Sequence, residues 1–194
     1  MNNQTKTYYC ASCNGETDTE IRKEEKKFTV KDKIVKVIIE TRYCCGCGNP
    51  VWDEEMEERN EKIVFDEYRA IKHFLSPEEI KTIRKTIGIS QATFSRLLGF
   101  GEKTITRYES GAPQDAAHNL LILYMKDKKN VQIALEANCS LLKARERSQI
   151  QSYLNTISLV ESLQLPQGAS ILQPMLVKFT QEVYNFRGVS KNYG

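Results

Sequence analysis

The spacing of apolar residues divides the chain into a β part and a longer helical part. Between residues 27 and 43, apolar and polar residues alternate imperfectly around the polar turn Lys31-Asp32-Lys33, and many of the apolar residues are β-branched. This pattern predicts a β-hairpin, with a third strand near residues 17–22. From residue 53 onward, apolar residues recur every three to four positions, which predicts amphipathic helices. The pattern therefore favours an α+β protein whose strands precede its helices.

The helical part begins with one long predicted helix. Residues 53–75 contain good helix formers, with acids toward the N-terminal end and bases toward the C-terminal end, as the helix dipole prefers. The predicted buried stripe of this helix consists of Ile63 or Val64, Tyr68, Ile71 and Leu75. Ser76 and Pro77 then suit the N-cap and the first position of a second helix, which Gly88 should end. The buried stripe of the second helix consists of Ile80, Ile83 and Ile87.

Residues 88–111 predict two short helices joined by a glycine-containing turn. Ser90 can cap the first helix, and Gly99 can end it because a residue without Cβ reverses the chain at low cost. The inward-facing residues of the first helix are Phe94, Leu97 and Leu98. Ser95 is small, and we expect it where the two helices cross. This arrangement is typical of a helix-turn-helix.

The second of these helices, about residues 102–110, has two unlike sides. At roughly 100° per residue, Ile105 and Tyr108 project to one side, and cations and hydroxyls project to the other. Lys and Arg can donate to guanine O6 and N7 in the major groove, and Thr can contact base edges or phosphates. Gln91, at the start of the preceding helix, can hold a phosphate. The candidate DNA contacts are Gln91, Lys103, Thr104, Thr106 and Arg107, and the acids expected to project sideways are Glu102 and Glu109. The alternative is an ordinary helical hairpin with a solvated polar side.

These residues resemble the Xre/Cro-type repressor family. The matching positions are Ser90-Gln91, Ser95, Leu98-Gly99, Thr106-Arg107-Tyr108-Glu109 and Gly111. The resemblance covers about residues 76–127 and implies an all-α helix-turn-helix domain that binds double-stranded DNA. It does not determine the operator sequence.

Two more amphipathic stretches lie in residues 131–194. Apolar residues recur at helical spacing between residues 141 and 165 and again between residues 172 and 186, with a break at Pro166-Gln167-Gly168. Such helices can pair with a second protomer or bind a partner, or they can pack on their own domain. We expect a helical extension that serves dimerisation or partner binding.

Six cysteines in a chain without a secretion signal favour metal binding over disulfides. Two Cys-x-x-Cys turns lie about thirty residues apart and consist of Cys10 with Cys13 and of Cys44 with Cys47. Four thiolates complete the tetrahedral coordination of zinc and leave no position for a substrate, so we expect a structural Zn2+ and not a catalytic one. The zinc would replace the core that so small a β domain lacks. Cys45 is left over, and Cys139 is expected to be a small core residue.

Charge is unevenly distributed along the chain. Residues 1–75 hold 13 Lys and Arg against 15 Asp and Glu, whereas residues 76–130 hold 9 against 6 and residues 131–194 hold 6 against 4. A basic excess therefore begins with the predicted helix-turn-helix, as phosphate binding requires. The chain has no apolar run of about 18 residues and no signal peptide, so we expect a cytoplasmic protein without a membrane partner.

The order of the predicted parts resembles a second family. A Cys-x-x-Cys pair, a β-hairpin, a second pair followed by Gly48, a linking helix and an Xre-type domain follow one another as in MqsA-type antitoxins, whose zinc finger is called YgiT-type. This resemblance spans residues 8–127. It implies that the zinc domain binds a cognate toxin and that the helical domain forms a homodimer on a palindromic operator. It also implies that Lys103 and Arg107 contact bases.

The predicted domains are a zinc-binding β domain (1–52), a linking helix (53–75), an Xre-type helix-turn-helix domain (76–130) and a helical extension (131–194). We expect a DNA-binding antitoxin of a type II toxin–antitoxin system that neutralises a toxin and represses its own operon. The alternative is a zinc-finger helix-turn-helix transcriptional regulator without a toxin partner. Enzymatic activity is not expected, because the predicted metal site is closed and both histidines lie in plain helices without a Ser/His/Asp arrangement. A thioredoxin-type redox pair is disfavoured because no βαβ pattern surrounds the cysteines.

Overall fold

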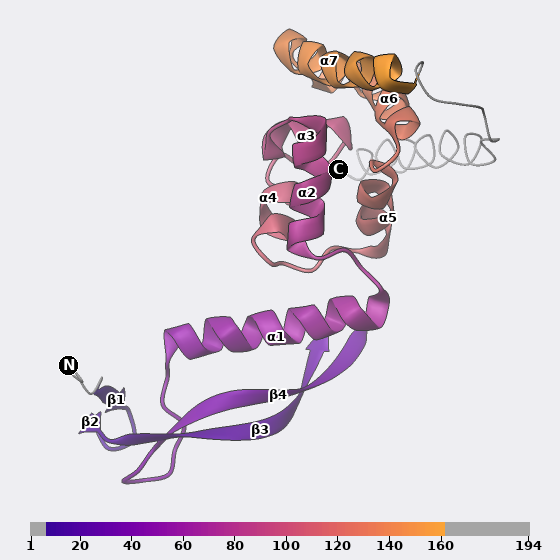
Figure 1. Cartoon of the computed structure of the whole chain (residues 1–194). Coiled ribbons are helices and arrows are strands. Elements are labelled where there is room, and N and C mark those ends of the chain that lie inside the picture. The colour runs from indigo at the N-terminus through magenta and orange to yellow at the C-terminus, as the bar shows by residue number, and fades with distance from the viewer. Residues whose placement is uncertain (1–6, 162–194) are drawn as a thin grey trace, which may run out of the picture. The chain divides into compact units, whose positions relative to one another are not determined.

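The computed structural model describes the backbone of residues 7–161 and the side chains of residues 7–155. The second stretch of the predicted extension, residues 172–186, lies outside the described residues. Within the described range the chain is α+β, as predicted, with four strands followed by helices (Figure 1). No helix of residues 7–161 is both long enough and apolar enough to cross a membrane.

Four strands form two small antiparallel sheets. β1 (Tyr8–Cys10) pairs with β2 (Gly15–Thr17), and β3 (Thr19–Val30) pairs with β4 (Lys33–Cys44). The predicted hairpin is confirmed, and it is longer than expected. The predicted third strand near residues 17–22 is wrong, because residues 19–22 extend β3. The first half of β3 is mostly polar, so an alternation of apolar residues does not mark it.

One long helix, α1 (Glu54–Lys72), packs on one face of the hairpin. Asp53 caps its N-terminus by accepting from the N–H of Met56. The core between α1 and the hairpin consists of Val30, Val35, Val37, Ile39, Val64 and Tyr68. Val64 therefore provides the buried contact, whereas Ile63 and Ile71 of the predicted stripe are exposed. Because each buried aliphatic side chain contributes about 1.5–3 kcal/mol, this contact stabilises a hairpin that would be marginal alone.

The side chain of Asn60 also ties α1 to the free edge of β4. Its amide oxygen accepts from the backbone N–H of Glu40 at 3.2 Å, and its amide nitrogen donates to the carbonyl of Glu40 at 2.7 Å. Farther along the same edge, the carbonyl of Arg42 accepts from the N–H of Val51 at 2.8 Å. Both contacts satisfy backbone groups that a two-stranded sheet leaves unpaired.

Short helices form the rest of the described chain. They are α2 (Pro77–Ile87), α3 (Gln91–Leu97), α4 (Thr104–Glu109), α5 (Ala116–Tyr124), α6 (Lys128–Ala137), the 3-10 helix η1 (Cys139–Leu141) and α7 (Ala144–Glu161). The predicted N-cap of α2 at Ser76 is confirmed, and Glu79 completes a capping box with it. Ile150 and Leu154 of α7 lie in the same hydrophobic core as the apolar residues of α2 to α5. The described part of the first stretch of the predicted extension therefore packs on its own chain.

Candidate metal centre and candidate nucleic-acid interface

Four cysteine thiols of the β part come together in one cluster. Cys10 ends β1 and Cys13 lies in the turn after it, whereas Cys44 ends β4 and Cys47 lies in the turn that follows. The four sulfur atoms all lie within 4.8 Å of one another. The sulfurs of Cys10 and Cys47 are 3.6 Å apart, and those of Cys13 and Cys44 are 3.7 Å apart. Four sulfurs around one tetrahedral ion at about 2.3 Å would be about 3.8 Å apart, so the cluster fits a metal ion.

Both cysteine turns have the backbone conformation that such a cluster requires. Asn14 has φ 54° and Gly48 has φ 73°, and each directly follows the second cysteine of its turn. Asn and Gly tolerate this left-handed region better than other residues do. The two turns therefore direct their paired thiols toward one point.

Cys44 is a cysteine whose thiolate the surrounding groups stabilise. Thr17 Oγ1 lies 3.2 Å from its sulfur, and the N–H of Gly46 donates to it at 3.3 Å. These hydrogen bonds, that of Thr17 foremost, lower the pKa of Cys44 to about 6. Hydrogen bonds with the neighbouring thiols, that of Cys47 foremost, raise the pKa of Cys13 to about 12. A metal ion that binds four thiolates would displace the remaining protons.

The cluster also supplies most of the core at its end of the β part. The buried residues there are Cys10, Cys44 and Val51, with Tyr8 packed against them. Two of these three residues are thiols of the cluster, so apolar packing alone contributes little. Four cysteines can fill a tetrahedral coordination sphere, which suits a structural metal and leaves no position for a substrate.

The other two cysteines lie outside the cluster. Cys45 is exposed, in agreement with its exclusion from the predicted ligands. The prediction of a core position for Cys139 is wrong, because this residue is exposed in η1. Leu142, which follows η1, is the residue that enters the core instead.

Helices α3 and α4 meet as the apolar spacing predicts. Ser90 caps α3 by accepting from the N–H of Thr93 at 3.1 Å. Ser95 is fully buried, and its hydroxyl accepts from the N–H of Ile105 at 3.3 Å. The apolar residues buried around this contact are Phe94, Leu97, Ile105 and Tyr108. A larger side chain at position 95 would force the two helices apart.

The outer side of α4 is polar and carries cations. Lys103, directly before the helix, and Thr106 and Arg107 within it are all exposed, and Thr104 is half-buried. Neither Lys103 nor Arg107 forms an ion pair with another residue of the described range. The structure therefore brings four of the five predicted DNA contacts to one short segment.

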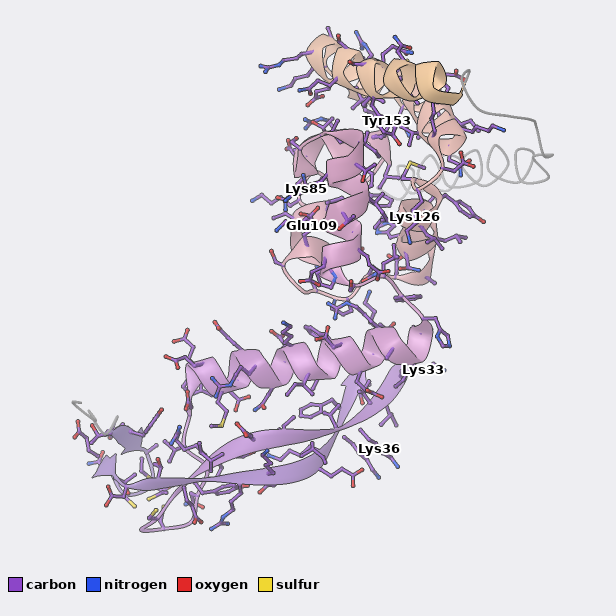
Figure 2. The ribbon with its side chains drawn as sticks, in the orientation of Figure 1. Lys33, Lys36, Lys85, Glu109, Lys126 and Tyr153 are labelled. Atoms are coloured by element: carbon purple, nitrogen blue, oxygen red, sulfur yellow. The ribbon has the colours of Figure 1, made fainter. Side chains whose placement is uncertain are left out.

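The helical spacing predicts that Glu109 projects sideways, and this prediction is wrong. Its side chain lies where α4 meets α2 and is only 4% exposed (Figure 2). Arg84 of α2 donates to its carboxylate through Nε at 2.6 Å and through Nη2 at 2.8 Å. Burial opposes the ionisation of Glu109, but the hydrogen bonds from Arg84 and Gln91 outweigh it and lower the pKa of the carboxyl. Sequence reasoning missed this pair because the two residues are far apart in the chain.

The fifth predicted contact, Gln91, belongs to the same network. Its amide nitrogen donates to Glu109 at 2.7 Å, and its amide oxygen accepts from the hydroxyl of Thr106 at 3.1 Å. Gln91 is therefore held beside the exposed side of α4 at the first residue of α3. One amide hydrogen of its NH2 group is left for a further acceptor.

Comparison with known families covers both sites. The family model described as the antitoxin component of bacterial toxin–antitoxin systems, MqsA, matches residues 6–133. No curated protein matches the chain. The matched region includes the four clustered cysteines and the helices α1 to α5. The chain therefore belongs to the MqsA family of antitoxins.

Proposed function

We propose that the chain is a DNA-binding antitoxin that neutralises a cognate toxin and represses its own operon. The observation that carries this proposal is the family match, because it spans the cysteine cluster and the exposed side of α4 in one chain. The same match supports a binding role and not an enzymatic one. Its partners would be a toxin protein and double-stranded DNA.

The DNA-binding half of the proposal rests on α4. Its outer side offers the side chains of Lys103, Thr106 and Arg107, while its inner side is anchored by Ile105 and Tyr108. A helix held in this way can enter the major groove with its cations toward base edges. The matching positions of the Xre/Cro-type resemblance lie on these same elements. We assign base contacts to Lys103 and Arg107, and contacts to base edges or phosphates to Thr104 and Thr106.

Gln91 is the proposed phosphate contact. It begins α3, where backbone N–H groups are free to bind an anion, and its amide is fixed by Glu109 and Thr106. A fixed amide loses little freedom on binding. Repressors of this type bind as homodimers on two half-sites, so we propose a homodimer on a palindromic operator.

The proposed metal is a structural Zn2+ bound by Cys10, Cys13, Cys44 and Cys47. Zinc prefers four thiolates at tetrahedral geometry, and the sulfur spacing agrees with this preference. We further propose the domain division into residues 1–52, 53–75, 76–130 and 131–194. The β part would bind the toxin, and the helical part would bind DNA.

The second candidate is a transcriptional regulator that binds DNA but has no toxin. The exposed side of α4 supports this reading equally well, because it concerns DNA alone. The two candidates differ in whether expression of the chain protects a cell from a toxin encoded beside it.

A growth assay with a promoter reporter tests the proposal. Cells that express the toxin encoded in the same operon should stop growing, and the intact chain should restore growth and silence the operon promoter. Arg107→Ala should restore growth but fail to silence the promoter, because it lies outside the β part. A chain that silences the promoter without protecting growth would favour the second candidate.

A further inference from the structure

The outer face of the β3–β4 hairpin has no partner among the described residues. Residues directly opposite each other in an antiparallel pair project to the same face. Of the pairs on the face opposite to α1, the three nearest the hairpin turn are Glu25–Ile38, Lys27–Lys36 and Thr29–Ile34. We call these six residues the outer patch. Lys36 points away from α1 in Figure 2.

Two isoleucines of the outer patch are unusually exposed. Ile34 and Ile38 are each 65% exposed, and they lie on the same face of β4 at two residues before and two residues after Lys36. Single exposed apolar residues are common on protein surfaces, but neighbouring ones on a flat face are typical of interaction sites. On the α1 face of the same hairpin, Val30, Val35, Val37 and Ile39 are buried and Phe28 is half-buried. Within the hairpin, the exposed large aliphatic side chains therefore lie on the outer face, where Ile21 is also exposed.

The lysines between these isoleucines form a like-charge pair. The backbone N–H and the carbonyl of Glu40 both form hydrogen bonds with the side chain of Asn60, so they point away from β3. Lys23–Glu40 is therefore a non-hydrogen-bonded pair of the ladder. Hydrogen-bonded and non-hydrogen-bonded pairs alternate along an antiparallel ladder, so Lys27–Lys36 is also a non-hydrogen-bonded pair. The side chains of such a pair lie close together.

Like charges directly opposite each other destabilise a sheet. Neither Lys27 nor Lys36 forms an ion pair or hydrogen bond with another residue of the described range. The hairpin therefore maintains an unfavourable contact that an added carboxylate would turn into a favourable one. An anionic group flanked by apolar surface is the chemistry that complements the outer patch.

We propose that the outer patch is a contact surface for the cognate toxin. The toxin would insert a carboxylate between Lys27 and Lys36 and cover Ile34 and Ile38 with apolar side chains. This inference rests on the proposed function, because it assumes that the chain has a cognate toxin.

Two other occupants complement the outer patch less well. A second copy bound by two-fold symmetry would place the lysine pair against itself, which adds to the repulsion. A nucleic acid would find no aromatic ring in the patch on which a base can stack. A protein surface with a carboxylate avoids both conflicts.

The substitutions Lys36→Glu and Ile38→Thr test this inference. Lys36→Glu replaces the repulsive pair with an attractive one, so the free chain should unfold at the same temperature or higher. Its affinity for the toxin encoded in the same operon should nevertheless fall about tenfold or more, since a repulsive group now meets the carboxylate. Ile38→Thr keeps a β-branched side chain and should also weaken the complex about tenfold. Titration calorimetry on the intact chain measures the affinities, and thermal unfolding measures the stability.

The matched controls are Lys62→Glu and Ile63→Thr, which change an exposed lysine and an exposed isoleucine on α1 of the same part of the chain. Both should leave the affinity within about twofold. Equal affinity of the wild type and the two outer-patch variants would overturn the inference, and so would equal losses in the controls. A change in self-association or DNA affinity in place of toxin affinity would also overturn it, in favour of a second copy or a nucleic acid. Absence of any complex with the wild-type chain would contradict the proposed function itself.

Discussion

At the scale of single residues, the carboxylate of Glu146 joins two helices. Its carboxylate accepts from Arg96 and from the hydroxyl of Thr93 on α3, the latter at 3.0 Å, and from the backbone N–H of Lys143 at 2.9 Å. Burial opposes the ionisation of Glu146, but these hydrogen bonds outweigh it and lower its pKa to about 2. The ionised carboxylate of Glu146 thus binds the start of α7 to α3.

Glu146→Gln should therefore make the stability of the helical part less sensitive to acid. The folded pKa of Glu146 is lower than the unfolded value of about 4.5, so its contribution is fully present above pH 4.5 and is lost as the pH falls toward 2. We expect a loss of about 2 kcal/mol in the free energy of unfolding at pH 7 and almost none near pH 2. Urea unfolding at several pH values measures this. The control Glu136→Gln on α6 changes an exposed carboxylate, and an equal effect there would contradict the role of Glu146.

Arg107→Ala should weaken specific DNA binding by about 1–3 kcal/mol and reduce discrimination at one base position. The reason is that its guanidinium is exposed on α4 without an ion-pair partner in the described part of the chain. Competition binding with duplexes that differ at single positions measures the discrimination. Lys126→Ala serves as a control for loss of charge alone. An equal loss on scrambled DNA would refute base contact by Arg107.

At the scale of elements, one buried ion pair orients the exposed helix. Arg84 and Glu109 join α2 to α4, and Gln91 joins α3 to α4. The side chains of Arg84 and Glu109 are 12% and 4% exposed, so water cannot solvate either charge if the other is removed. This contact holds the outer side of α4 in one orientation relative to α3.

Glu109→Gln should destabilise the helical part by about 3 kcal/mol, because it leaves the Arg84 guanidinium buried without a compensating charge. Thermal unfolding of the intact chain measures the loss. The double variant Arg84→Met, Glu109→Leu should recover much of it, since buried pairs can often be replaced by apolar residues. A single variant as stable as the wild type would show that the pair does not orient α4.

Short-range patterns explain which elements could be predicted. The four clustered cysteines follow from two local turns of fixed spacing, and the buried stripes of α2 and α3 follow from helical periodicity. Contacts between distant polar residues leave no periodic trace, so the burial of Glu109 and the bond from Asn60 to Glu40 were not predictable. Periodicity also could not choose between Ile63 and Val64, because adjacent residues differ by only part of a turn.

At the scale of the whole molecule, the chain combines two kinds of stabilisation. Within the described residues, the helical part has one core that contains residues from Leu75 to Leu154. The β part has two small cores, one of which consists mainly of clustered cysteines. Its stability should therefore depend on the metal, whereas that of the helical part should not.

Removal of the metal should unfold the cysteine end of the β part and leave DNA binding within about threefold of its original strength. A chelator can reach the ion because Cys13 and Cys47 are exposed. Atomic absorption should find about one zinc per chain before treatment, and amide hydrogen exchange should then increase in residues 7–52 alone. Cys44→Ser should have the same effect. A variant that stays folded without metal would contradict the structural role of the cluster.

The most direct test is to measure the binding of the intact chain to a duplex from its own promoter and to a scrambled duplex of equal length. Fluorescence anisotropy at about 0.15 M salt suits this comparison, because high salt suppresses unspecific phosphate contacts. We predict binding to the promoter duplex about a thousandfold tighter than to the scrambled one. Equal affinity for both duplexes would contradict the assignment of the exposed side of α4 to sequence recognition.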